Sequence, residues 1–463
     1  MSLFLNTKNK SRNVELIALL PLLILGGGVL HIRNRKQFQE SLPTFADQES
    51  TRVAFGSCSY HDHPQPLWDQ IQQQKPHVWA WLGDIVYTDQ EINWYTSVPA
   101  TEERVTSFFQ IQKERQDYRQ AILDQNVTVL GIFDDHDFGL DNSGYWSPVK
   151  ELAQKTLLDF LDVPESDPRR SRPGVYHSID LEEGRVKMIF LDARYFQELP
   201  LYTPDMENLT QEKPDLLGRE QWIWLEQELA SSTAKVHLIA SGIQIIPDDK
   251  DDPVRVLTSD RVRIESWGRF PSSRTKLLKL LADYQIPGAI LLSGDVHFAE
   301  MSVLPCSDIG YPLYELTSSG MTHSWGFSLF DFWHGSPIWE ILYDYVVLTV
   351  IPNRFRVPGA YFSNLNFGMI SIDWRHSLIK MQVFGRTGVA FQKTISLDEL
   401  KPGVNDKICS ASEKSYAAKN AFELSTTYLW KFRLAGILSI PIVLTSASFG
   451  YLISRATYSK TII

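Results

Sequence analysis

The chain has 463 residues, of which 22% are charged and 12% are aromatic, a balance typical of a globular protein. Its formal net charge of -10 argues against a nucleic-acid-binding protein, which usually carries a basic surface. The three cysteines, Cys58, Cys306 and Cys409, are too few for a disulfide-stabilised scaffold, and their odd number leaves at least one without an intramolecular partner.

The first element that the sequence predicts is a membrane helix. Leu16–Ile32 is apolar apart from three glycines and His31, and basic residues precede it. It is about as long as the shortest spanning helices, which have roughly 17 residues. No cleavage site of the Ala-x-Ala kind follows it, so we expect a retained anchor and not a removed signal peptide.

Further along the chain, apolar runs typical of strands alternate with segments that have a helical pattern. The apolar runs are Thr51–Cys58, Val78–Leu82, Asn126–Phe133, Val186–Leu191, Lys235–Ser241 and Ala289–Leu292. The helical segments are Pro66–Gln74, Glu102–Gln125 and Gly218–Leu229, the last with Gln221, Trp222, Leu225 and Leu229 at helical spacing. This alternation predicts a layered α/β domain, and Phe367–Ile372 with Leu378–Phe384 resembles an antiparallel hairpin near its end.

Leu434–Ile453 is the second candidate membrane helix. It carries no charge, basic residues flank it, and its length is close to the roughly 20 residues that a span needs. Pro441 would kink it, which membrane helices tolerate; the alternative is a buried C-terminal helix. We therefore expect an N-terminal tail and anchor over 1–36, a folded α/β domain over 37–405, a linker or helix over 406–433, and a C-terminal transmembrane helix with its tail over 434–463. Two spans would place the domain over 37–405 on one side of a membrane, and we favour the extracytoplasmic side.

Polar side chains that can bind metals follow several of the predicted strands. They are Cys58, Asp84 with Tyr87, the Asp134–Asp137 cluster, and Asp295 with His297. In open α/β sheets, ligand sites lie at the carboxyl ends of the strands. Each residue alone could belong to a solvated turn or a buried core, but their repetition at strand ends favours a multinuclear metal site. Cations would also remove the mutual repulsion of so many carboxylates.

These motifs resemble those of the PhoD-like (alkaline phosphatase D) metallophosphatases, distant relatives of the calcineurin-like phosphoesterases. The resemblance rests on Gly-Ser-Cys at 56–58, Gly-Asp-x-x-Tyr at 83–87, Asp-Asp-His-Asp at 134–137 and Gly-Asp-Val-His at 294–297, and it extends to 191–195, 218–225 and 317–323. It implies a four-layer α/β/β/α sandwich, here with terminal transmembrane helices. It also implies hydrolysis of phosphate mono- or diesters by a metal-activated water.

The resemblance further implies iron(III) and calcium as cofactors, although other divalent metals would also suit such ligands. The implied metal ligands are Cys58 and Tyr87 on iron, Asp84 between metals, and Asp135, Asp295 and His297. His136 would lie beside the scissile phosphate. Relatives often continue the Asp-Asp-His-Asp motif with Asn-Asp, whereas this chain has Asp141 and Asn142, so which of the two approaches a metal stays open.

Two further residues are candidate catalytic groups. Arg194 follows a predicted strand, and its forked guanidinium suits a phosphate oxygen; the alternative is a surface salt bridge. His323 lies in a Ser/Thr/Gly-rich segment and is a candidate to protonate the leaving group; the alternative is a structural hydrogen bond.

Two alternatives to a membrane-anchored phosphoesterase stay open. A nuclease or other phosphodiesterase would use the same metal site but would need a basic groove, and a non-catalytic membrane protein would keep the site as a structural element. The apolar segment Gly326–Ile351 is either a helical hairpin packed on the domain or a lid that dips into a membrane. The second interpretation would make the phosphate-ester substrate membrane-borne.

Overall fold

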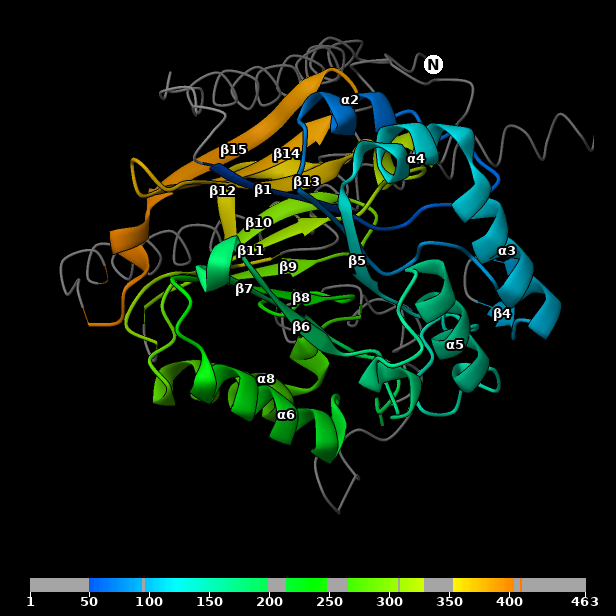
Figure 1. Cartoon of the computed structure of the whole chain (residues 1–463), viewed down its shortest axis with the longest axis horizontal. Helices are drawn as coiled ribbons and strands as arrows, with labels where there is room; N and C mark the ends of the chain where they lie inside the picture. Colours follow the sequence, from blue (N-terminus) through cyan, green and yellow to red (C-terminus); the bar gives the residue numbers. More distant parts are fainter. Residues whose placement is uncertain are drawn as a thin grey trace, which may run out of the picture. The chain divides into compact units, whose positions relative to one another are not determined.

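Two β-sheets form the centre of the fold in the computed structural model, which describes residues 50–93, 96–198, 214–247, 265–306, 309–328, 353–403 and 409 (Figure 1). By its internal contacts the chain divides into two compact units, Met1–Asp406 and Lys407–Ile463. Nearly all of the described residues belong to the first unit, and both sheets lie in it.

Within the described residues, the first sheet has six strands. From edge to edge they are β15 (Gly388–Ser396), β14 (Leu378–Gly385), β13 (Phe367–Asp373), β1 (Ser50–Gly56), β2 (Val78–Leu82) and β5 (Thr128–Ile132). β1, β2 and β5 run parallel, so their carboxyl ends lie at the same edge of the sheet. β13 and β14 pair antiparallel, which confirms the predicted hairpin.

The second described sheet has seven strands. In order they are β12 (Arg356–Phe362), β10 (Ala299–Leu304), β11 (Leu313–Ser318), β9 (Ala289–Ser293), β8 (Val236–Ser241), β7 (Val186–Leu191) and β6 (His177–Leu181). The four strands from β11 to β7 are parallel and fully buried, which explains why they read as continuous apolar runs. A separate ribbon pairs β3 (Gln90–Asn93) with β4 (Thr96–Val98).

Helices flank the two sheets. They are α2 (Trp68–Gln73), α3 (Glu102–Glu114), α4 (Gln116–Ala121), α5 (Lys150–Phe160), α6 (Gly218–Ser231), α8 (Pro271–Asp283) and the short α9 (Trp325–Ser328). Figure 1 shows α6 and α8 along the outer side of the seven-stranded sheet, and α2 and α4 on the side of the six-stranded sheet. α6 buries the four residues that its spacing predicted. The helix predicted over Glu102–Gln125 is divided at Arg115, where the backbone is not helical (ψ 129°).

An aromatic cluster attaches α2 and α4 to the strand that carries Asp84. Trp79 and Trp81 lie two residues apart on β2 and therefore point to the same face. The ring of Trp68 on α2 packs edge-on against both, at 5.1 and 5.7 Å, and Tyr118 on α4 lies 5.1 Å from Trp68. All four rings are at most 1% exposed, so removing one would cost about 3–5 kcal/mol of stability. The end of β2 is thus held rigidly.

The prediction of terminal transmembrane helices was wrong. Across the described residues, no helix has the length and apolar character that a membrane span requires. α6 has 14 residues and is amphipathic, whereas a span needs about 20 apolar residues. The fold is therefore corrected to a mixed α/β fold with two sheets, and the expected membrane location is withdrawn with it. Leu16–Ile32, Leu434–Ile453 and most of the predicted lid, positions 329–352, lie outside the described residues.

Candidate metal centre

The candidate ligands meet because strands of both sheets end at one place. Cys58 follows β1, Asp84 follows β2 and Asp135 follows β5, all in the six-stranded sheet. Asp295 and His297 follow β9 of the seven-stranded sheet. The two sheets therefore contribute opposite sides of one centre.

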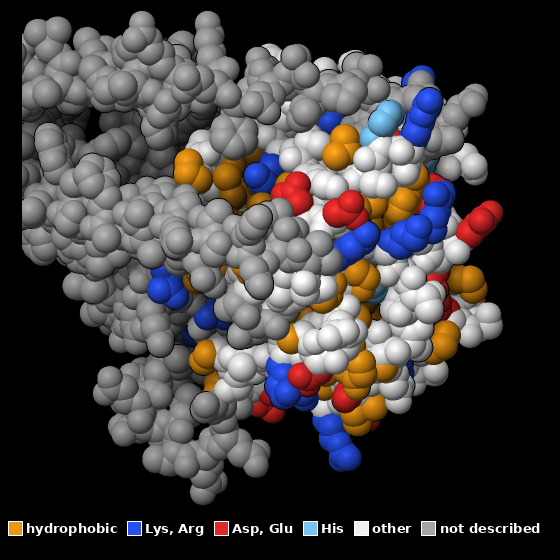
Figure 2. Space-filling view, turned by 90° about the vertical axis from the view of Figure 1, so that its left-hand side faces the viewer, with side chains coloured by type: hydrophobic (Ala, Val, Ile, Leu, Met, Phe, Trp, Pro, Cys, Tyr) orange, Lys and Arg blue, Asp and Glu red, His pale blue; other side chains and the backbone are white. Residues whose placement is uncertain are grey.

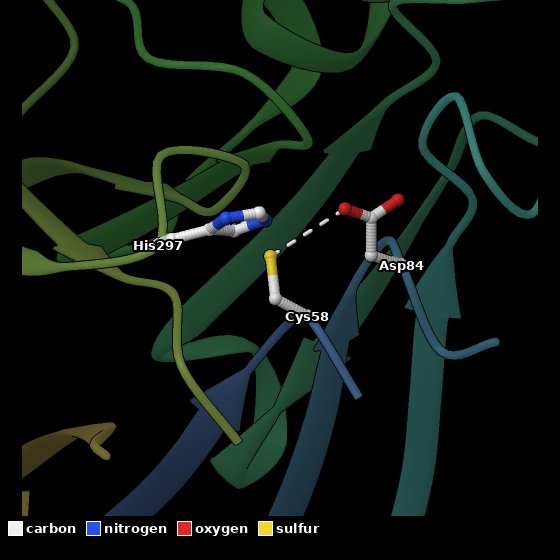
Figure 3. Close-up of side chains that lie close together, drawn as sticks. All are labelled: Cys58, Asp84 and His297. Carbon is white, nitrogen blue, oxygen red and sulfur yellow. Dashed lines mark hydrogen bonds between the residues drawn. The ribbon is translucent and has the colours of Figure 1, made fainter. Parts of the chain in front are cut away.

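The first group of ligand atoms combines sulfur, oxygen and nitrogen. Atoms of Cys58, Asp84 and His297 lie within 4.8 Å of one another, and Figure 3 shows the three side chains pointing toward a common space. Cys58 Sγ is 3.4 Å from Asp84 Oδ2. The phenol oxygen of Tyr87 lies 3.3 Å from Asp84 Oδ2 and 3.2 Å from His297 Nε2. Four of the six predicted metal ligands are thus close together.

Two further groups extend the first. One consists of Asp84, Asp135 and His136, and the other of Asp134, Asp135 and Asp295; each has its ligand atoms within 4.8 Å of one another. Asp84 belongs to the first two groups and Asp135 to the last two. Because a carboxylate can bind two cations with its two oxygens, this sharing suits a site with more than one metal.

The carboxylates of the centre are poorly solvated, and their charges repel. Burial raises the pKa of Asp84 and Asp295 well above the ordinary value, and neighbouring acidic groups raise it further. Burial likewise raises the pKa of Cys58 to about 12. Asp135 is different: burial opposes its ionisation, but Arg194 and His136 outweigh that effect and lower its pKa to about 2. Cations would replace the protons that this cluster otherwise retains.

Unsatisfied acceptors show that the residues fit metal ions. Asp84 Oδ1 and Asp134 Oδ2 are buried and have no hydrogen-bond partner in the described part of the chain. Buried polar atoms are nearly always paired, so an orphaned carboxylate oxygen in such a cluster is a natural position for a cation. The donor set also suits metals, because it joins a thiol, a phenol, imidazoles and carboxylates.

The backbone is strained where it presents these ligands. Cys58, Asp84, Asp295 and His297 all have positive φ angles, of 60°, 48°, 71° and 57°. Such a conformation costs a residue other than glycine about 1–3 kcal/mol and tends to cluster at functional sites. The surrounding sheets must hold these four residues in place, which is what a preformed ligand site requires.

His136 lies at the edge of the centre in a defined orientation. Its Nδ1 is 2.7 Å from Asp89 Oδ1, and its ring packs on Tyr87 with centroids 4.1 Å apart. Its Nε2 lies 4.0 Å from Asp141 Oδ1. Although burial favours the neutral imidazole, the surrounding carboxylates raise the pKa of His136 well above its ordinary value.

Asp141 and Asn142 approach the centre in different ways. The side chain of Asp141 faces His136 and is 30% exposed. Asn142 donates its backbone N–H to Asp135 Oδ2 at 2.5 Å. Asp141 therefore brings a carboxylate to the site, whereas Asn142 holds another residue's carboxylate with its backbone.

Arg194 is fully buried behind the centre. Its Nη1 lies 2.6 Å from Glu265 Oε2, its Nε forms an ion pair with Asp134, and its Nη2 is 3.9 Å from Asp135 Oδ1. The side chain is thus no surface salt bridge. It supplies positive charge to the carboxylates from the protein interior.

His323 lies against two candidate ligands. Its Nε2 is 3.0 Å from the phenol oxygen of Tyr87 and 3.3 Å from Nε2 of His297. Burial lowers the pKa of His323 well below 6.5 and that of His297 to about 4. Burial thus favours the neutral form of both imidazoles.

Several residues of the centre were missed from the sequence. Asp89 orients His136 and Ser319 contacts Cys58 Sγ at 2.9 Å; both lie within or beside recognised motifs, so closer attention to those motifs could have found them. Asp134 belongs to the predicted cluster, although only Asp135 was selected from it. Glu265 lies in no strand-end motif, and no local signal points to its pairing with Arg194.

Comparison with known proteins identifies the class of protein that this fold and site define. A model of the PhoD-like phosphatases matches residues 53–325, more than half of the chain. The protein is thus a metal-dependent phosphoesterase. It belongs to the PhoD-like phosphatase family, which confirms the resemblance seen in its motifs.

One solved structure shows the same fold. The chain is similar to the structure of PhoD, with a TM-score of 0.53 and 14% sequence identity, over 83% of this chain and 79% of that one. It also matches a conserved uncharacterized protein from Streptococcus pneumoniae TIGR4, a predicted phosphoesterase, with a TM-score of 0.23 and 9% identity over 75% of this chain and 98% of that one. The second likeness is too weak to carry an argument. No curated protein matches the chain.

Proposed function

We propose that this protein hydrolyses phosphate mono- or diesters at the centre formed by the two sheets. The observation that carries the proposal is the continuous series of three ligand groups, joined through Asp84 and Asp135. Bound cations would lower the pKa of a water molecule and neutralise charge on the phosphoryl oxygens. The residues of the chain orient the ester and keep the carboxylates in position.

The proposed metals are iron(III) and calcium. Cys58, Tyr87 and His297, together with Asp84, offer the sulfur, phenol and imidazole ligands that suit a transition metal. Asp134, Asp135 and Asp295 offer only oxygen atoms, which calcium prefers. The iron assignment rests on family resemblance together with this donor set.

His136 is proposed to contact the scissile phosphate. If Nδ1–H donates to Asp89, Nε2 is directed toward the carboxylates of the centre, where a phosphoryl oxygen would also lie. A protonated Nε2 at that position would donate a hydrogen bond to an anionic oxygen of the ester. Arg194 is proposed to act through Asp134 and Asp135, which it holds in position.

The charge of the surface bears on the choice of ester. Figure 2 shows one face of the molecule. In its described part, Lys and Arg side chains lie among acidic and apolar ones. A nuclease would need a continuous basic surface to bind a phosphate backbone. The chain has a net charge of -10, so small phosphate esters suit it better than a nucleic acid does.

Asp84→Asn tests the proposal, because Asp84 belongs to two of the ligand groups. The variant should lose at least about 100-fold in hydrolysis of a monoester and a diester, and it should bind less metal, while its circular dichroism stays unchanged. Metal content is measured by elemental analysis of the purified chain, and visible absorption reports iron bound by Tyr87. Asp62→Asn is the matched control, because Asp62 is 65% exposed. Full activity in Asp84→Asn would refute the assignment.

A further inference from the structure

We propose that His323 is a metal ligand of this centre, bound through Nε2 beside Tyr87 and His297. This proposal rests on the proposed function, because it adds a residue to the same ligand set. It differs from the role that the sequence suggested, in which His323 protonates the leaving group. A metal ligand needs a lone pair on Nε2, whereas a proton donor needs a hydrogen on the nitrogen that faces the substrate. The hydrogen-bond partners of the ring therefore distinguish the two roles.

The convergence of three atoms is the first observation. His323 Nε2 lies 3.0 Å from Tyr87 Oη and 3.3 Å from His297 Nε2, and Tyr87 Oη is 3.2 Å from His297 Nε2. Two imidazole nitrogens and a phenol oxygen thus form a triangle with all sides at or below 3.3 Å. The phenol has one hydrogen and can serve only one of the two nitrogens at a time. A cation in contact with all three atoms would use their lone pairs together.

The hydrogen bonds of Thr322 favour a proton on Nδ1 of His323. Thr322 Oγ1 accepts the backbone N–H of Tyr60 at 2.8 Å and donates its own hydrogen to the carbonyl of Cys58 at 3.3 Å. It lies 3.0 Å from His323 Nδ1, and while it donates its one hydrogen to Cys58 O it accepts there. This arrangement places the proton on Nδ1 and leaves the lone pair on Nε2. This is the tautomer of a histidine that binds metal through Nε2 while its other nitrogen donates to a neighbour.

The same geometry disfavours a proton donor. A leaving-group acid must present an N–H to the substrate, whereas the N–H of His323 is directed at Thr322. The ring is only 8% exposed, and Nε2 faces Tyr87 and His297. A substrate oxygen would have to approach an atom that has no proton to give.

Backbone hydrogen bonds fix the position of His323 relative to other ligands. The N–H of Met321 donates to Ser57 O at 3.1 Å, and that of Thr322 donates to Cys58 O at 3.2 Å. The N–H of Trp325 donates to His297 O at 2.9 Å. The turn that carries His323 is thus attached directly to the segments that carry Cys58 and His297. Ligand sites of this kind depend on such rigid support.

Iron retention by the full-length chain tests the proposal without relying on activity. Wild type and His323→Ala are dialysed against graded citrate, and the iron that stays bound is determined by elemental analysis. We expect His323→Ala to release iron at a citrate concentration on the order of 10- to 100-fold lower than wild type does. Hydrolysis should fall equally for aryl and alkyl esters, because losing a ligand does not depend on the leaving group. His63→Ala is the control, since His63 is an exposed histidine whose ring stacks on Tyr60 at 4.6 Å.

A second pair of variants keeps the test decisive if His323→Ala does not fold. Thr322→Ser keeps the hydroxyl that fixes the tautomer and should retain iron as wild type does. Thr322→Val removes that hydroxyl at nearly constant shape and should weaken iron retention. Wild-type retention in His323→Ala, with a loss confined to esters of poor leaving groups, would overturn the proposal in favour of a proton donor. If wild type holds no metal at all, the proposed function itself fails, which is a distinct result.

Discussion

Arg194 shows how a single buried charge can serve a cluster of opposite charges. A guanidinium without solvent costs several kcal/mol of hydration, and only close partners offset that loss. Here Glu265 and Asp134 pair with it directly, and Asp135 lies 3.9 Å away. The arrangement supplies positive charge to the side of the centre that faces the protein interior. The opposite side then stays available for cations and substrate.

Arg194→Ala should therefore act mainly on stability. Removing one partner leaves Glu265 and Asp134 as buried, uncompensated charges, which costs about 3–5 kcal/mol of unfolding free energy. Urea unfolding followed by circular dichroism measures the loss. Lys279→Ala is the control: the Lys279–Asp283 pair is solvent-exposed, so the variant should lose at most about 1 kcal/mol. If Arg194→Ala instead has wild-type stability but a raised KM, the result favours the phosphate-binding role that the sequence suggested.

At the scale of the element, strand β2 and the turn after it explain the Gly-Asp motif. All five residues of β2 are buried, and the chain then turns at Gly83 with φ of +85°. A Cβ atom at Gly83 would lie 2.3 Å from Asp134 Cβ and 2.7 Å from the Asp134 backbone nitrogen. Glycine is thus needed for its conformation and also because the turns after β2 and β5 touch. The turns that carry Asp84 and the Asp134–Asp135 pair can therefore lie against each other.

Gly83→Ala should disrupt the centre more than a conformational penalty alone would. Gly184 is a matched control, because its φ is +84° and a Cβ there would meet nothing within 4 Å. Gly184→Ala should cost about 1–2 kcal/mol and leave bound metal unchanged. Gly83→Ala should cost more and also lower metal content, because Asp134 must move. Thermal unfolding and elemental analysis of both variants measure these effects. Equal losses of stability and equal metal content in the two variants would show that the close approach of Gly83 to Asp134 is unimportant.

At the scale of the whole molecule, the sequence predicted local features better than long-range partners. Val78–Leu82 was recognisable because a strand buried on both faces leaves an unbroken apolar run. The same logic located Asp84 and Asp295 at strand ends. Tyr87 and His323 are 236 positions apart, however, and no local pattern shows that their side chains meet. Partners of this kind depend on how the two sheets pack.

The wrong membrane prediction has a physical cause of a similar kind. It rested on apolar length, the lack of charge and the flanking basic residues, and these features alone do not distinguish a membrane span from other apolar segments. The described helices instead bury one face each on a sheet or a neighbouring helix, as α6 does with Trp222 and Leu225. Periodicity thus predicted the buried face of α6 correctly, whereas both candidate spans lie outside the described residues.

Because the two sheets contribute opposite ligands, metal binding should stabilise the whole fold. Cys58 and Asp84 come from the six-stranded sheet, and His297 comes from the seven-stranded one. A ligand that binds only the folded chain at 100 times its Kd adds about 2.7 kcal/mol of stability. Wild type should therefore melt several degrees lower after treatment with a chelator, and metal should restore its Tm. The Tm of Asp84→Asn should be nearly the same with chelator and with metal, since two of its ligand groups are impaired. Calorimetry of both proteins measures this, and an unchanged Tm in chelated wild type would mean that the metals do not link the sheets.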